Sequence, residues 1–160
     1  MQESSNKIIQ QGEIVSFDTD MVGPYGYCAD ISRTFVCGND FNNNQKELYS
    51  MSLEQINHNS NLIKADMSFK EFTEKSWKLP EEYYGNRYSV MVHGIGLCDE
   101  WPSIRYPTDG GDKSGRFLKN MTITVESYIG KVGGKEGVKL EQQYLVGENG
   151  LELMSHHPLE

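Results

Sequence analysis

The chain has 160 residues, a formal net charge of −8 and 37% hydrophobic residues. This length is enough for one domain with a real core, and the acidic balance excludes nucleic acid as a main partner and argues against docking on an anionic membrane. No stretch approaches the about 20 apolar residues of a membrane span, and the polar start MQESSNKIIQQGE lacks the features of a signal peptide. Cys28, Cys37 and Cys98 form no CxxC pair, so we expect reduced thiols in a cytoplasmic protein, with a 28–37 disulfide as the alternative.

The first part of the chain predicts a β-hairpin followed by helices. Strands are expected over 12–21 and 27–35, joined by the turn VGPYG, whose glycines and proline suit a turn. A helix is expected over 39–65, where a run of asparagines offers N-caps. A second, short helix is expected from Ser68, because Ser68 and Glu71 have the spacing of a capping box.

The second part of the chain predicts strands separated by loops. A loop over 80–87 precedes a strand over 88–97, which runs into the glycine-rich turn HGIG. The segment 101–120 holds several prolines and glycines and is expected to be a long surface loop. Strands follow over 121–129 and 138–146, joined by the turn KVGGKEG, and we expect the polar end HHPLE to be frayed.

Acidic side chains recur on the polar faces of these expected strands. Residues two apart on a strand share a face, which places Asp18 beside Asp20. Any one such carboxylate is accounted for by a solvated outer face of an antiparallel sheet. The whole set comprises Asp18, Asp20, Asp30, Glu126, Glu141 and the imidazole of His93. These groups could converge only if cations such as two divalent metals neutralised them, and hard oxygen ligands with one histidine suit iron, manganese, cobalt or zinc.

Four blocks of sequence carry a resemblance to a known family. FDTDMVGPYGYCADISRTF, VHGIGL, MTITVESYIG and GVKLEQQYLV resemble the metallopeptidase family of creatinase, prolidase and methionine aminopeptidase. The match covers residues 12–147, and it implies an α+β pita-bread fold with a two-metal site. The peptidases have one aspartate eleven residues before Asp30, where this chain has Thr19 between two aspartates. They also have a substrate-contacting histidine seven residues after His93, where this chain has Glu100, which argues against peptidase activity.

Both departures, with the string HGIGLCDEWP, resemble the dimethylsulfoniopropionate lyase branch of that family. This resemblance implies six metal ligands, namely Asp18, Asp20, Asp30, His93, Glu126 and Glu141. It implies two divalent ions, with iron favoured and zinc, manganese or cobalt as alternatives. It also implies that Asp99, six residues after His93, is the catalytic base, and that Tyr88, five residues before it, orients the substrate or assists the leaving group. The residues alone favour Asp99 as a loop-capping residue, and they also allow Tyr88 as a core aromatic.

The expected reaction removes the proton beside the carboxylate of dimethylsulfoniopropionate and expels dimethyl sulfide, leaving acrylate. The alternatives are an Xaa-Pro dipeptidase or aminopeptidase, and a non-catalytic binding module on the same fold. We expect residues 1–160 to form a single partial pita-bread domain, the C-terminal metal-binding portion, without the upstream helices and N-terminal domain. One sheet face is then expected to be uncovered and apolar. The expected partner is a small-molecule substrate, with a homodimer in the full-length protein.

Overall fold

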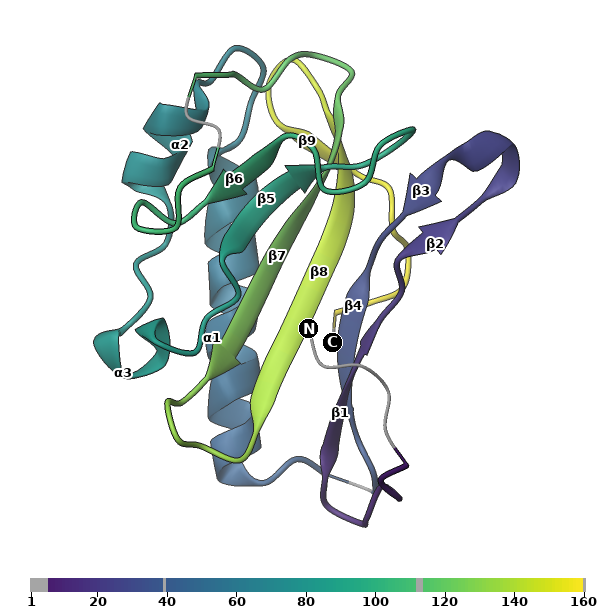
Figure 1. Cartoon of the computed structure of the whole chain (residues 1–160), viewed down its shortest axis with the longest axis vertical. Coiled ribbons are helices and arrows are strands. Elements are labelled where there is room, and N and C mark those ends of the chain that lie inside the picture. The colour runs from purple at the N-terminus through teal and green to yellow at the C-terminus, as the bar shows by residue number, and fades with distance from the viewer. Residues whose placement is uncertain (1–5, 39, 112–113, 160) are drawn as a thin grey trace.

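A five-stranded antiparallel sheet forms the centre of the molecule, and the long helix α1 covers one of its faces (Figure 1). This computed structural model describes residues 6–38, 40–111 and 114–159. The strands follow the order β6-β5-β7-β8-β9. Their bounds are β5 Val90–Gly94, β6 Ser103–Arg105, β7 Thr122–Gly130, β8 Gly137–Val146 and β9 Leu151–Leu153.

A hairpin lies beside β8 and carries the first acidic motif (Figure 1). Strand β1 (Ile14–Asp18) pairs with β4 (Ser32–Val36), and β2 (Met21–Val22) pairs with β3 (Cys28–Ala29) around the short 3-10 helix η1 (Pro24–Gly26). The predicted hairpin is therefore present, but its ladder is interrupted where the Thr19 hydroxyl donates to the Ile31 carbonyl at 2.9 Å. The expectation that Asp18 and Asp20 share one continuous strand is wrong, because β1 ends at Asp18.

The helices begin where the capping signals indicate. Helix α1 (Asn43–Leu62) is shorter than the expected 39–65; the Asn42 side chain accepts from the Gln45 amide, and the Gln45 side chain accepts from the Asn42 amide. Helix α2 (Phe69–Lys75) begins after Ser68, whose hydroxyl accepts from the Glu71 amide at 3.1 Å. The expected loop 80–87 instead contains the one-turn helix α3 (Glu81–Tyr84), whose two glutamates favour a helix N-terminus.

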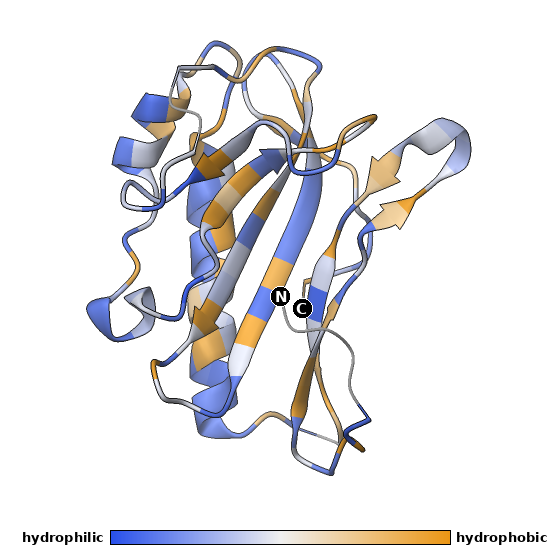
Figure 2. Cartoon of the chain, viewed as in Figure 1, coloured by the Kyte–Doolittle hydropathy of each residue, from blue (hydrophilic) through white to orange (hydrophobic). Residues whose placement is uncertain are grey.

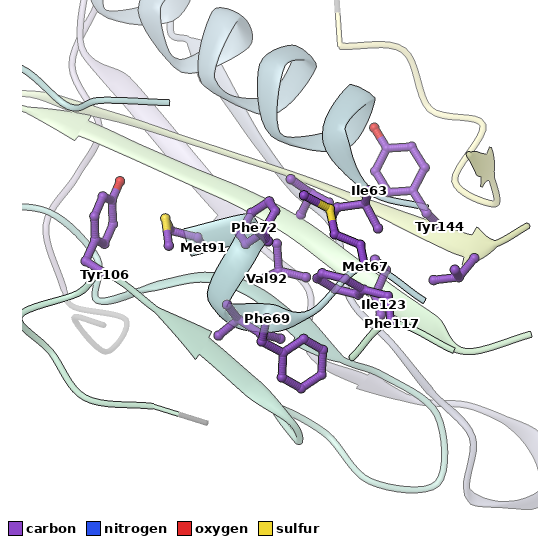
Figure 3. Close-up of a cluster of buried hydrophobic side chains, with 13 residues drawn as sticks. Ile63, Met67, Phe69, Phe72, Met91, Val92, Tyr106, Phe117, Ile123 and Tyr144 are labelled. Carbon is purple, nitrogen blue, oxygen red and sulfur yellow. The ribbon is translucent and has the colours of Figure 1, made fainter. Parts of the chain in front are cut away.

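The hydrophobic core lies on one face of the sheet, and the opposite face is polar. Phe117 packs edge to face against Phe69 and Phe72, with ring centroids 4.9 and 5.7 Å apart (Figure 3). A second cluster joins α1 to β7 and β8 through Leu48, Ile56, Ile129, Val138 and Leu140. Apolar and polar residues alternate in the first half of β8, from Val138 to Glu141 (Figure 2), so packing one face against α1 leaves the other face, with Glu141, turned toward the hairpin.

Apolar side chains are exposed on the hairpin. Phe17 on β1 is 59% exposed and Phe35 on β4 is 49% exposed, while Met21 and Val22 on β2 are also exposed. Figure 2 shows hydrophobic residues along both strand pairs of the hairpin. The inner side of the hairpin is polar instead, since the Ser16 and Thr34 hydroxyls hydrogen-bond at 2.8 Å and Thr34 donates to the Lys139 carbonyl. The apolar face of the hairpin is therefore the exposed one, and its polar face is turned toward β8.

The C-terminal segment is bound to the fold, so the expectation that HHPLE frays is wrong for residues 157–159. The Arg33 guanidinium donates to the carbonyls of His157 and Pro158, and the Tyr49 hydroxyl donates to the Leu159 carbonyl. The expected loop 101–120 contains strand β6, which pairs with β5; residues 112 and 113 lie outside the described part.

The described cysteines are all free, which removes the alternative of a 28–37 disulfide. Among the described residues, no helix has both the length and the apolar character to cross a membrane.

Candidate metal centre

His93 lies at the middle of the polar face of the sheet, near the end of β5, and is buried. Its Nε2 atom is 3.2 Å from Glu141 Oε1, 3.5 Å from Asp30 Oδ2 and 3.7 Å from Glu126 Oε1. Its Nδ1 atom is 3.0 Å from the Gly94 carbonyl oxygen, which can only accept. Nδ1 therefore donates, and the ring is oriented with Nε2 toward three carboxylates, as in histidines that bind metals.

Gly94 makes this arrangement sterically possible. A Cβ atom at position 94 would lie 2.1 Å from the Trp101 carbonyl oxygen and 2.8 Å from the Pro102 ring. Only glycine lets the chain of the following loop cross so close to the strand end. The HGIG turn thus returns the loop that carries Asp99 and Glu100 toward the centre.

The two glutamates come from neighbouring strands and face each other. Glu126 on β7 and Glu141 on β8 are Cα partners in the ladder, and both are buried. Their Oε1 atoms lie toward His93, while their Oε2 atoms lie toward the ammonium of Lys139. The Ser32 hydroxyl is also 2.8 Å from Glu141 Oε2.

The three aspartates of the hairpin reach the centre from different points. Asp30, between β3 and β4, is buried and approaches His93. Asp18, at the end of β1, accepts from the Ser32 hydroxyl at 2.5 Å. Asp20 is exposed, and its oxygen lies within 4.8 Å of oxygens of Asp30 and Asp99. The hairpin interruption therefore separates Asp18 and Asp20 but keeps both beside the centre.

The two residues expected to be catalytic lie on either side of β5. Asp99 is half-buried in the loop after the strand, and its Oδ1 accepts from the Glu100 amide at 3.0 Å. Tyr88 precedes the strand; its hydroxyl donates to Glu100 Oε1 at 3.0 Å, and its ring centroid is 4.7 Å from Lys139 Nζ. The structure thus brings all eight sequence-predicted site residues to one side of the sheet.

Two buried carboxylate oxygens show that the donor set fits metal ions. Asp30 Oδ1 and Glu126 Oε1 have no hydrogen-bond partner among the described residues. A buried, unpaired charged oxygen is costly, and bound divalent cations would supply the missing partners. Ligand atoms of Asp30, His93 and Glu141 lie within 4.8 Å of one another, and oxygen ligands with one imidazole suit a first-row divalent ion.

Burial and mutual repulsion shift the ionisation of the metal-free site. Burial raises the pKa of Asp30 to about 7 and that of Glu126 to about 8, although His93 and Lys139 respectively oppose the shift. Burial would lower the pKa of His93, but hydrogen bonds to Asp30 and Glu141 raise it to about 11. Burial works against ionisation of Glu141, yet Lys139 and His93 lower its pKa to about 2.

Ser32 and Lys139 were missed from the sequence, and Glu100 was noted only as the residue that replaces the peptidases' histidine. Lys139 lies two residues before Glu141, so strand alternation does place it on the same polar face. A lysine on a strand is ordinarily solvated, and nothing local distinguishes a buried one. Ser32 and Glu100 carry no local signal for their contacts, because their partners lie on other segments.

Comparison with known proteins identifies the family of the chain. Residues 1–148 match metallopeptidase family M24, and the chain belongs to that family. Enzymes of this family use divalent metal ions, for which the Asp30, His93 and Glu141 group is the candidate here. The chain is 38% identical to dimethylsulfoniopropionate lyase DddP of Roseovarius nubinhibens, over 99% of this chain and 36% of that protein. It is 33% identical to an Xaa-Pro dipeptidase of Pyrococcus furiosus, over 95% of this chain and 42% of that protein.

Solved structures agree on the fold. The prolidase of Pyrococcus furiosus superposes with a TM-score of 0.76 at 31% identity, covering 94% of this chain and 43% of that one. The X-Pro aminopeptidase of Thermotoga maritima gives 0.79 at 27% identity, covering 99% and 44%. The expected pita-bread fold is confirmed. The chain spans less than half the length of each of these relatives.

Proposed function

We propose that the protein is a metal-dependent lyase that cleaves dimethylsulfoniopropionate to dimethyl sulfide and acrylate. The observation that carries this proposal is the position of Asp99, whose carboxylate oxygen lies within 4.8 Å of ligand atoms of Asp20 and Asp30. A base for proton removal must lie beside the group that binds the substrate's carboxylate. The 38% identity to a dimethylsulfoniopropionate lyase supports the same reaction.

The six ligands proposed for two divalent ions, iron favoured, are Asp18, Asp20, Asp30, His93, Glu126 and Glu141. When bound, the ions would supply Lewis-acid stabilisation of the negative charge that develops on the substrate carboxylate. The protein's part is to hold the ligands: Gly94 O fixes the His93 ring, and Ser32 bridges Asp18 and Glu141.

Asp99 takes the proton in this proposal. It removes a proton from the carbon next to the substrate carboxylate; the released electron pair forms the C=C bond of acrylate, and the bond from the next carbon to sulfur breaks with its electrons on sulfur. Dimethyl sulfide leaves as a neutral molecule, and the proton stays on Asp99. Burial raises the pKa of Asp99, His93 opposes this and Asp20 adds to it, so that the carboxylate is a stronger base than usual.

Tyr88 acts as a neutral phenol. Burial, Glu126 and Glu100 all raise its pKa, so the hydroxyl keeps its proton and donates to Glu100. A phenolate base at this position is therefore disfavoured. We assign Tyr88 the role of orienting the substrate, with its ring held over Lys139.

An Xaa-Pro peptidase is the second candidate, because the chain is 33% identical to an Xaa-Pro dipeptidase. Glu100 weighs against it. The family resemblance expects a substrate-contacting histidine at this position, and this chain has a glutamate there instead. The Glu100 carboxylate is also engaged by the Tyr88 hydroxyl.

The test is dimethyl sulfide in the headspace over metal-reconstituted protein given dimethylsulfoniopropionate. Asp99→Asn keeps the shape but removes the base, and we expect it to lower the rate at least about 100-fold. Asp40→Asn is the matched control, since Asp40 is exposed before α1. Cleavage of Xaa-Pro dipeptides without dimethyl sulfide would replace the lyase with the peptidase. No bound metal after reconstitution would favour a binding module.

A further inference from the structure

Lys139 is a buried cation among the carboxylates of the centre. Its Nζ atom donates to Glu126 Oε2 and lies 3.5 Å from Glu141 Oε2 and 3.9 Å from Asp18 Oδ2. The Tyr88 ring covers it with its centroid at 4.7 Å. The residue is only 7% exposed, so water contributes little to the solvation of the ammonium and the carboxylates replace it.

Lys139 and His93 divide the oxygens of the two glutamates between them. On Glu126 and on Glu141, Oε1 lies toward His93 and Oε2 toward Lys139. Glu126 Oε1 has no hydrogen-bond partner among the described residues. Lys139 therefore holds the oxygens that face away from His93 and leaves the opposite oxygens available for metal.

The charges of the centre indicate why a fixed cation is needed. The proposed ligands include five carboxylates, Asp18, Asp20, Asp30, Glu126 and Glu141. Two divalent ions leave one of these negative charges uncompensated. Before metal binds, His93 and Lys139 are the cationic side chains within 4 Å of the buried glutamates in the described part of the chain.

We propose that Lys139 is a permanent counter-cation of the metal centre, which holds Glu126, Glu141 and Asp18 together before metal binds and neutralises the charge that two divalent ions leave. This inference rests on the metal centre and not on the lyase reaction. It makes Lys139 a positioning residue, because it acts through the glutamates rather than on the substrate.

The test compares thermal unfolding of the purified protein with chelator and with added Mn²⁺ or Zn²⁺. We expect Lys139→Met to lower the melting temperature of the metal-free protein by about 10 °C, since it leaves buried carboxylates without their cation. Added metal should recover most of this loss, because it neutralises the same carboxylates. Lys131→Met is the matched control: Lys131 pairs with Glu82 at 2.6 Å on the surface, and its small effect should be the same with and without metal.

A second variant keeps the test decisive if Lys139→Met does not fold. Glu126→Gln added to Lys139→Met removes one uncompensated carboxylate at the same volume, and we expect it to restore much of the metal-free stability. A loss of equal size with and without metal, or no recovery by Glu126→Gln, would overturn the counter-cation and leave a packing role. Metal content measured on the same samples separates this outcome from failure of the metal centre, and dimethyl sulfide release separates it from failure of the lyase.

Discussion

Glu126 and Glu141 are direct partners across the β7–β8 ladder, and both side chains are buried. Like charges directly opposite each other destabilise a sheet, and burial adds the cost of desolvation. The pair persists because His93 contacts one side of it and Lys139 the other. The contacts with His93 and Lys139 therefore offset the repulsion and desolvation that would otherwise destabilise this pair of glutamates.

Glu141 contacts more of the centre than Glu126 does, so its neutralisation should be the more damaging. Glu141→Gln removes the anion that His93, Ser32 and Lys139 share, and we expect the metal-free protein to lose about 2–4 kcal/mol of unfolding free energy. Bound metal should fall as well. Denaturant unfolding and elemental analysis measure the two effects. Glu148→Gln, at an exposed pair with Lys119, is the control, and equal losses in both variants would contradict the prediction.

Metal affinity should increase with pH between 6 and 8. In the metal-free protein the raised pKa values of Asp30, about 7, and Glu126, about 8, mean that metal must displace protons at the lower pH. Each proton released increases the affinity about tenfold per pH unit below the pKa. Competition with a chelator of known affinity measures this.

The metal-free protein should show the opposite trend in stability. Both carboxyls have raised pKa values, so the folded state binds more protons than the unfolded state, and their contribution to stability is lost as pH rises through 7 to 8. Thermal unfolding in chelator at pH 6 and pH 8 checks the sign. A metal affinity that does not change with pH would argue that both carboxyls are already ionised and that His93 is already neutral before metal binds.

Arg33 should be important for stability although it is not one of the proposed site residues. Its guanidinium donates to the Glu141 carbonyl, the Gln142 side chain and the carbonyl of Pro158. The ammonium of Arg33→Lys cannot reach these separate acceptors, so we expect a loss of about 2–4 kcal/mol and faster proteolysis at the C-terminal end. Arg105→Lys is the control: among the described residues Arg105 makes one side-chain hydrogen bond, to Ser103, and this change should alter stability by about 0.5 kcal/mol or less.

The exposed apolar face of the hairpin should bind hydrophobic dyes. Phe17 is 59% exposed on this face, so Phe17→Thr should reduce dye fluorescence and self-association while changing the unfolding free energy by about 0.5 kcal/mol or less. Metal content should not change, because the Phe17 side chain lies on the face of β1 opposite Asp18. A large loss of stability would show that Phe17 is packed in solution.

Much of the local structure follows from the sequence. The caps of α1 and α2 depend on residues a few positions away in the chain. The same is true of the side-chain alternation on β7 and β8, which places the acidic residues of the motif blocks on polar faces. The small elements α3 and β6 were missed, because a single helical turn and a three-residue edge strand depend on the strands and helices that they pack against.

By itself, the sequence determined which residues lie on polar strand faces, because side-chain alternation is a local property of the backbone. The tertiary structure decided which faces meet. Ser32 and Glu141 touch although 109 residues separate them, and the Thr19–Ile31 hydrogen bond breaks the strand that was expected to carry both aspartates. It also buries Lys139 beside Glu126, a pairing that the sequence does not predict. Burial and the distances between charges arise only when distant segments pack, and these decide whether a set of acidic residues is a solvated surface or a cation site.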